Sequence, residues 1–577
     1  MSNEAAALGV KKERQFVPAD FIVTDWAALE PFYNELLERP LPALVAVQQW
    51  LRDRSELDSV VSEEYRWRYI NMTRDTRDLE TTEKLQFYYK ELDPKLNTYN
   101  FKLNEKLVAS PFIDELDPNQ YFIYLRNVRK QIELYREENL PLFKELKLKE
   151  NEYASIIGNM EVVYQGKTYT LQQASKYLKN PDRNVREEVY RIISERRHTD
   201  QQKLDDLFDE LIKLRHQVAL NAGFENFRDY KFASMGRFDY TPDDCTAFHN
   251  SVAEVVTPVV GNLVAKRKDK LGVDPLRPWD LDVDTEGKQA LKPYEDGTDL
   301  TNKTIGVLDS VDHYFAECLS NMKEHGYLDL DSRSGKAPGG YNMTLPETGS
   351  AFIFMNSAGS DRDVKTMVHE AGHAVHSFLS HHQELMYFRQ YPSEVAELAS
   401  MSMELFTMPH WSVFYADSEE LKQSQKLQLE GILKVLPWIA IIDKFQHWIY
   451  TNPTHTQQQR KDTWLAIYRE FHASDPTNWN GLEEHLAYMW HKQLHLFEVP
   501  FYYIEYGMAQ LGAVAMWRQM LQHGHQAIEN YKAALALGYT RPIGEIYSTA
   551  GVEFRFDKDY INELVSFLLG EYAKYES

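Results

Sequence analysis

Cysteine and long apolar runs are both scarce in this 577-residue chain. The only two cysteines, Cys245 and Cys318, are too few for a disulfide scaffold or a cysteine-rich metal cluster. No window approaches the ~18 consecutive apolar residues of a membrane span, and residues 1–30 lack the apolar segment of a secretion signal. We therefore expect a cytoplasmic protein in which any metal is held by histidine and carboxylate ligands.

Positive charge is also in short supply. Asp and Glu number 87 against 64 for Lys and Arg, which gives a formal net charge of -23 at pH 7. A nucleic acid would be repelled by such a chain unless a basic face were segregated, and no basic run occurs. We therefore expect neither nucleic acid nor a membrane as a partner.

Tandem repeats and low-complexity tracts are absent, whereas amphipathic helical patterns are abundant. Residues 119–135, for example, carry apolar side chains at three-to-four-residue spacing. Residues 161–170, with Gln165 and Gly166 at their centre, predict a β-hairpin, and residues 350–356 (SAFIFMN) predict a short strand. The pattern as a whole predicts a mainly α fold.

The length of the chain predicts more than one lobe, because a single core rarely serves so many residues. Pro181 and Asp182 open a highly charged helix, so we predict an N-terminal helical lobe over residues 1–185. Residues 186–577 are then the domain that carries the chemistry. The strand at 350–356 lies just before the motif described next, and we interpret it as an edge on which an extended peptide could pair.

A predicted helix over residues 361–380 carries the motif HEAGH. Its apolar stripe and the capping-box spacing at its start are typical of a partly buried helix. His369 and His373 are four residues apart, so they project from one face and can bind one metal ion together. Glu370 points beside the pair, which suits a base that activates water better than a third ligand.

A second predicted helix, over residues 391–405, carries three carboxylates downstream of the motif. Glu394, Glu397 and Glu404 share a face that also holds small or apolar residues. Carboxylates on such a face usually have a partner, and the apolar neighbours argue against a solvated acidic surface. The residues alone leave open which carboxylate completes a metal site with the two histidines.

The segments HEAGHAVHSFLS and EVAELASMSMEL resemble the oligoendopeptidase F family of thimet-oligopeptidase-like zinc peptidases, as does GGYNMTLPETGSAFIFMN upstream. The resemblance implies that His369, His373 and Glu397 bind one zinc ion per chain and that Glu370 is the general base. It also implies a two-lobed, helical zincin-type fold with a deep substrate channel and a small β-sheet beside the metal.

Near the C-terminus, HLFEVPFYYIEYG supplies His495, Tyr503 and Tyr506, which match a histidine and a Tyr-x-x-Tyr pair of the same family. The resemblance assigns these side chains to hydrogen bonding the transition state. Tyr502 is the alternative to Tyr503, because it lies one helical turn before Tyr506. We prefer Tyr503, whose three-residue spacing is closer to the family pattern.

The expected function is a zinc metalloendopeptidase acting on short unstructured oligopeptides. Two alternatives are a dipeptidyl- or monocarboxypeptidase on the same scaffold, which needs a cation for the substrate's C-terminal carboxylate, and a catalytically inactive peptide-binding module, which has no need of the ligands. The sequence leaves open the cleavage preference, the peptide length and the oligomeric state, with which a monomer is compatible. It also leaves open the role of His376 and whether Glu394 or Glu404 orients a ligand imidazole.

Overall fold

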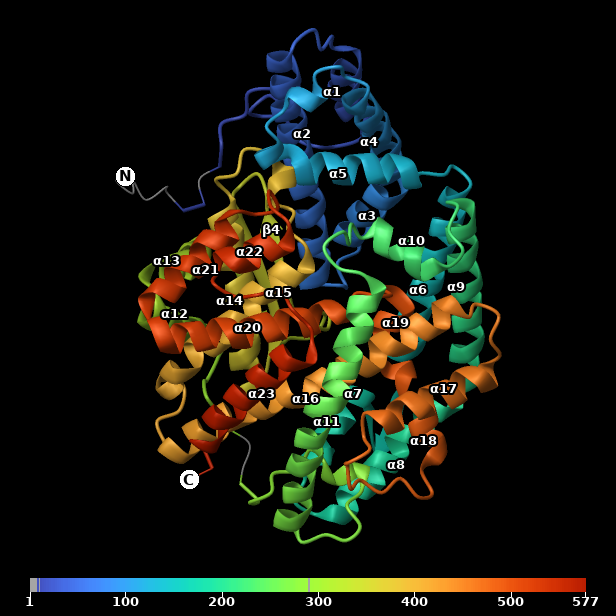
Figure 1. The fold of residues 1–577 in the computed structure, drawn as a ribbon, viewed down its shortest axis with the longest axis vertical. Helices are drawn as coiled ribbons and strands as arrows, with labels where there is room; N and C mark the ends of the chain where they lie inside the picture. Colours follow the sequence, from blue (N-terminus) through green and yellow to red (C-terminus); the bar gives the residue numbers. More distant parts are fainter. Residues whose placement is uncertain (1–7, 10, 289–290, 577) are drawn as a thin grey trace. The chain divides into compact units, whose positions relative to one another are not determined.

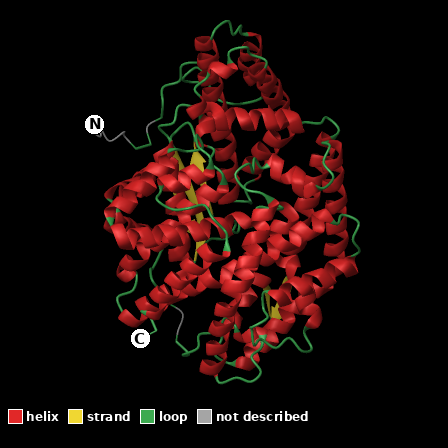
Figure 2. Cartoon of the chain, viewed as in Figure 1, coloured by secondary structure: helices red, strands yellow, loops and turns green. Residues whose placement is uncertain are grey.

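Helices dominate the chain in the computed structural model, which describes residues 8–9, 11–288 and 291–576 (Figure 2). Among these residues the strands form one hairpin and one three-stranded sheet. This confirms the mainly α fold class predicted from the spacing of apolar residues. No helix in the described part of the chain is both long and apolar enough to span a bilayer.

Two compact units divide the chain, and each is assembled from three separate segments. The first unit contains the residues up to Glu133, Leu291–Lys426 and Ala509–Phe554. The second contains Leu134–Ala290, Leu427–Met508 and the residues from Arg555 onward. Helices α16 (Ser418–Thr451) and α20 (Ile504–His523), both labelled in Figure 1, have residues in both units, and the last residue of α5 (Pro118–Leu134) belongs to the second.

The first unit contains the N-terminal helices and the three-stranded sheet. Its helices are α1 (Trp26–Glu38), α2 (Leu44–Arg74), α3 (Leu79–Phe87), α4 (Asp93–Val108), α5 (Pro118–Leu134), α12 (Gly297–Val311), α13 (His313–Glu324), α14 (Asp361–Ser380), α15 (Ser393–Thr407), α21 (His525–Ala536) and α22 (Ile543–Thr549). The fully buried Leu29, Trp50 and Leu103 belong to one apolar cluster that also includes Leu385 and Phe388, from the segment between α14 and α15. Burial in this shared core therefore holds that segment against the N-terminal helices.

The three-stranded sheet lies next to α14 in the chain. Its strands are β3 (Leu328–Asp331), β4 (Tyr341–Leu345) and β5 (Ser350–Ser357), in the order β3-β5-β4. β5 pairs parallel with β3 and antiparallel with β4, so it is the central strand. The prediction of an edge strand at 350–356 was therefore wrong. The consecutive apolar residues of SAFIFM are typical of a strand covered on both faces, and the first six residues of β5 are buried.

The second unit contains the predicted hairpin. Its helices are α6 (Asn139–Gly158), α7 (Leu171–Ser175), α8 (Arg183–Thr199), α9 (Gln201–Asn221), α10 (Phe227–Ser234), α11 (Pro242–Leu271), α17 (Gln457–Glu470), α18 (Glu483–Ala487), α19 (Leu494–Glu498) and α23 (Lys558–Ala573). β1 (Glu161–Tyr164) and β2 (Lys167–Thr170) pair antiparallel. Gln165 and Gly166 between them both have positive φ, 49° and 73°, as a two-residue hairpin turn of type I′ requires.

Candidate metal centre and active site

Helix α14 begins and ends where the sequence predicts, at Asp361 and Ser380. Its first turn is held by Asp363, whose carboxylate accepts hydrogen bonds from the Ser360 backbone N–H at 2.8 Å and from the Tyr294 hydroxyl at 2.7 Å. The predicted apolar stripe is buried, with Val364, Met367 and Val368 all at 0% exposure. One face of α14 thus packs in the core, while another carries the motif histidines.

Gly372 brings α14 close to α15. A Cβ atom at this position would lie 2.6 Å from the Ser400 Cα atom and 2.9 Å from the Ala399 backbone oxygen. A side chain of any size would therefore push the two helices apart. Because the motif histidines lie on α14 and Glu397 lies on α15, this close approach determines whether the three side chains can meet.

The structure brings His369, His373 and Glu397 together. The Glu397 Oε2 atom lies 3.4 Å from Nε2 of His369 and 3.9 Å from Nε2 of His373. One donor atom from each residue lies within 4.8 Å of the other two. Neighbouring ligand atoms of a tetrahedral zinc ion are about 3.4 Å apart, given metal–ligand bonds of about 2.1 Å. The donor set and its spacing therefore fit zinc with little adjustment.

Glu404 supports the first histidine. Its Oε1 atom lies 2.7 Å from Nδ1 of His369, on the side of the ring away from Glu397. A carboxylate in this position selects the tautomer with Nε2 available to a metal. Of the two glutamates left open by the sequence, Glu404 therefore supports a ligand imidazole. The backbone carbonyl of Glu394 instead accepts a hydrogen bond from the Tyr547 hydroxyl at 2.9 Å.

Burial and the contacts among the ligand residues shift their pKa values. Burial alone would lower the pKa of His369, but its hydrogen bonds to Glu397 and Glu404 hold that pKa well above its usual value. Burial lowers the pKa of His373 to about 4, which favours the neutral imidazole that metals bind. Burial opposes ionisation of Glu397, yet its hydrogen bond to His369 and the charge of His373 lower its pKa to about 2.

Glu370 is buried beside the ligands but does not join them. Its Oε2 atom is buried without a hydrogen-bond partner among the described residues. Desolvation raises its pKa to about 7, so the carboxyl can both accept and release a proton near neutral pH. Its backbone carbonyl accepts a hydrogen bond at 3.1 Å from the side chain of Asn342 on β4, which ties the helix to the sheet.

His376 packs against Tyr391. Its ring is fully buried and stacks on Tyr391, with ring centroids 3.4 Å apart and an interplanar angle of 12°. Burial lowers its pKa well below the usual value, so it is a neutral ring. These contacts favour a packing role for the histidine whose function the sequence left open.

The four candidate side chains near the C-terminus form a cluster in the second unit. The His495 ring lies 4.7 Å from that of Tyr503 and 6.0 Å from that of Tyr506, measured between ring centroids. Burial lowers the pKa of His495 to about 4 and raises that of Tyr503 to about 12. Tyr502 lies in the same cluster, 5.3 Å from Tyr506, so the alternative between Tyr502 and Tyr503 stays open.

Two supporting residues were missed in the sequence. Gly372 is part of the HEAGH motif, and a glycine inside a helix is itself a signal of close packing. Asn342 has no such signal, because its contact with the backbone of α14 depends on the position of β4 in the sheet. Both set the position of the helix that carries His369 and Glu370.

Comparisons with known proteins show the family to which the chain is similar. A family model described as "Peptidase family M3" matches residues 176–566, and one described as "Peptidase M3 N-terminal domain" matches residues 16–135. Oligopeptidase PepF of Bacillus subtilis is 23% identical over 297 residues, which are 51% of this chain and 44% of that protein. An oligoendopeptidase F homolog of Borreliella burgdorferi is 22% identical over 391 residues, 67% of this chain and 64% of the relative.

These alignments cover less than two thirds of either relative's own length. The similarity of fold extends further. A solved structure titled as PZ peptidase A with an inhibitor has a TM-score of 0.88, covering 97% of this chain and 99% of that chain at 24% identity. At this level of identity the likeness shows a shared fold over nearly the whole chain.

Proposed function

Because the chain belongs to peptidase family M3, we propose that it is a zinc-dependent metalloendopeptidase that hydrolyses short, unstructured oligopeptides. The observation that carries the proposal is the meeting of His369, His373 and Glu397 beside the unpartnered, buried carboxyl oxygen of Glu370. Two imidazoles and one carboxylate are the ligand set of hydrolytic zinc sites with an open position. Zinc held there would supply a Lewis acid that lowers the pKa of a coordinated water to about 7.

The chain's own residues then divide the work. Glu370 takes the proton of the attacking water and passes it to the amine that leaves when the peptide C–N bond breaks. Glu404 holds His369 in the tautomer that can bind the metal, through its contact at 2.7 Å. We also propose, from the sequence resemblance, that His495 and Tyr506, with Tyr503, hydrogen-bond the oxyanion of the transition state.

The sheet suggests where a substrate could pair. β4 has β5 on one side, and its other edge has no strand among the described residues. An extended peptide could therefore add to β4, the strand whose Asn342 contacts the backbone of the catalytic glutamate. Only an unfolded segment can pair in this way, which is why we propose short unstructured peptides as substrates.

Two further predictions stay proposals. One is the division into an N-terminal lobe (1–185) and a catalytic domain (186–577): two separate family matches support two parts, although the gap between them, residues 136–175, precedes residue 185. A reducing compartment such as the cytoplasm is supported by Cys245 and Cys318, neither of which takes part in a disulfide.

A digest of a peptide library with and without a chelator, read by mass spectrometry, tests the activity. We expect internal cleavage that the chelator stops and added zinc restores. Removal of one or two C-terminal residues only would favour the carboxypeptidase alternative. Binding of peptides without cleavage in the zinc-loaded protein would favour the inactive peptide-binding module.

Metal content tests the ligands. His373→Ala and Glu397→Ala should each lose tight zinc binding, because either change removes one of three ligands. Glu394→Ala, on the same face of α15, is the matched control and should retain zinc. Stoichiometric zinc in the Glu397 variant, together with its loss in the Glu394 variant, would show that the wrong carboxylate was chosen.

A further inference from the structure

A second cluster of metal-binding side chains lies within the second unit, on helices α11 and α16. Cys245, Asp443 and His447 each offer one donor atom, and these atoms lie within 4.8 Å of one another. Cys245 and Asp443 are fully buried, and His447 is 9% exposed. The mechanism proposed above uses none of them.

Asp443 lies at the centre of this cluster. Its Oδ2 atom is 2.8 Å from Nε2 of His249 and 3.2 Å from Nε2 of His447. The other carboxylate oxygen of Asp443, Oδ1, is buried without a hydrogen-bond partner in the described part of the chain. Leaving such an atom unpaired costs about 1–3 kcal/mol, which a bound cation would offset.

The surroundings of Asp443 are apolar, so an ionised carboxylate is unfavourable there unless its charge is neutralised. The His447 ring packs against Phe232 and Phe501, with ring centroids 5.8 Å and 5.4 Å away. Burial opposes ionisation of Asp443, yet the charge of His447 and the hydrogen bond from His249 hold its pKa well below the usual value. An ionised carboxylate in this apolar setting needs a cation, either a proton on an imidazole or a metal ion.

We propose that Cys245, Asp443 and His447 form a second, structural zinc site, in which the hydrogen bond from His249 orients the Asp443 carboxylate. A thiolate, an imidazole and a carboxylate are all zinc ligands, and the two anions neutralise the divalent ion in the buried site. Cys245 is in the first turn of α11, where the helix dipole favours the thiolate. The sulfur would move by at most about 1 Å to reach bonding distance.

Cobalt substitution of the full-length protein distinguishes this site from the catalytic one. A thiolate bound to Co²⁺ gives an intense near-ultraviolet charge-transfer band, whereas two imidazoles and a carboxylate do not. We expect the band in the cobalt-loaded wild type and its loss in Cys245→Ser. Cys318→Ser removes the only other cysteine and should retain the band, as should Glu397→Ala, which alters only the catalytic ligands.

Zinc content gives an independent readout. The wild type should hold about two zinc ions per chain, and His447→Ala about one, with peptidase activity kept. A single zinc ion in the wild type, with no charge-transfer band in excess Co²⁺, would overturn the site and leave a proton as the counter-charge of Asp443. If Cys245→Ser does not fold, the Cys318→Ser chain, with its single thiol, still decides the question. The band depends on Cys245 alone, so the result is separable from the proposed peptidase function.

Discussion

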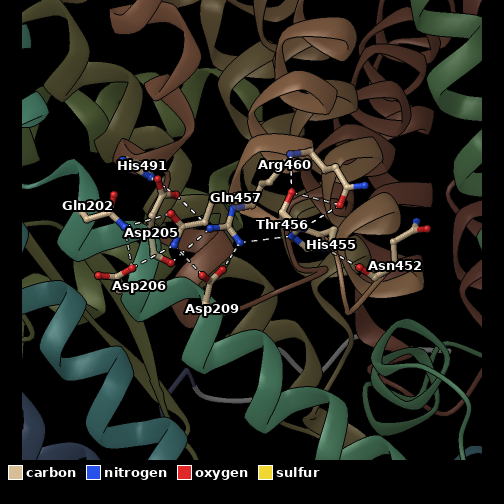
Figure 3. Close-up of polar contacts among 11 residues, drawn as sticks. Gln202, Asp205, Asp206, Asp209, Asn452, His455, Thr456, Gln457, Arg460 and His491 are labelled. Atoms are coloured by element: carbon tan, nitrogen blue, oxygen red, sulfur yellow. Dashed lines mark hydrogen bonds and ion pairs between the residues drawn. The ribbon is translucent and has the colours of Figure 1, made fainter.

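The ligand cluster (His369, His373, Glu397 and Glu404) and the Arg460 cluster (Arg460, Asp205, Asp209 and His491) both bury a carboxylate beside a histidine, but they balance its charge differently. Figure 3 shows the Arg460 cluster. In the Arg460 cluster the guanidinium is bonded to Asp209 at 2.6 Å and to Asp205 at 3.1 Å. His491 then approaches the same Asp205 oxygen, at 3.3 Å. This cluster contains its own permanent cation.

In the ligand cluster, imidazoles are the basic groups that pair with Glu397 and Glu404, and the Ser400 hydroxyl also donates a hydrogen bond to Glu397 at 3.2 Å. An imidazole can lose its proton, whereas a guanidinium does not, so this cluster can exchange its positive charge for a metal ion. Burial and composition therefore do not distinguish a binding site from a structural network. The source of the positive charge does.

Glu370→Gln should have the largest effect on activity, and this effect should be limited to the ligand cluster. The amide keeps the shape but cannot accept the water's proton, so turnover should fall by about 10²- to 10⁴-fold. Steady-state kinetics on a peptide, with zinc measured in parallel, checks this. Zinc content and peptide binding should be unchanged, and near-normal turnover would remove Glu370 from the mechanism.

Arg460→Met should affect stability where Glu370→Gln affects catalysis. Removing the guanidinium leaves Asp205 buried without its permanent cation, which should lower the free energy of unfolding by about 3–5 kcal/mol. Lys461→Met is the matched control: the pair with Glu484 is partly exposed, with the carboxylate side chain 56% accessible, and should contribute less than about 1 kcal/mol. Denaturant titration measures both, and equal losses would contradict the assigned role of Arg460.

Glu404→Gln should weaken zinc binding by about 10- to 100-fold without a comparable loss of stability, because it removes the support behind His369. Competition with a chromogenic chelator measures the affinity. Glu394→Gln, a change of the same size on the same helix, resolves the alternative left open by the sequence. A larger loss in the Glu394 variant would reverse the two roles.

Gly372→Ala should have the smallest effect of the four. The added methyl group meets the Ser400 backbone at 2.6 Å, so we expect an overpacking cost of about 1–3 kcal/mol and weaker zinc binding as α15 is displaced. Gly306 in α12 has open space around it, and Gly306→Ala should be neutral or stabilising by up to about 1 kcal/mol. If the two variants have the same thermal stability, close packing at Gly372 is not needed.

Local patterns predicted the elements of the molecule well. The bounds of α14, its capping interaction with Asp363 and the turn at Gln165 and Gly166 depend on neighbours in the chain, and all three follow from short-range rules. The central position of β5 did not follow from local patterns, because strand order depends on long-range pairing with β3 and β4. The contact of Asn342 with α14 was missed for the same reason.

The sequence pattern predicted the two histidine ligands but did not by itself identify the carboxylate ligand. The four-residue spacing of His369 and His373 predicts one face of a helix. Which carboxylate faces them depends on how α15 crosses α14, so spacing left Glu394, Glu397 and Glu404 as alternatives and only the family resemblance chose Glu397. The buried group around Asp443 was not predicted, because its residues come from distant segments of the chain.

The two proposed metal sites are completed at different times during synthesis, because their residues are separated by different numbers of positions in the sequence. His369 and Glu404 are 35 positions apart, so a ribosome delivers the whole ligand set of the first site within one helical pair. In the second site, Asp443 is synthesised 194 positions after His249. Until then, the incomplete site would contain a reactive thiol. Long loop closure is slow, and such partly assembled states are exposed to misfolding. The nascent chain should therefore acquire its catalytic metal before its structural one.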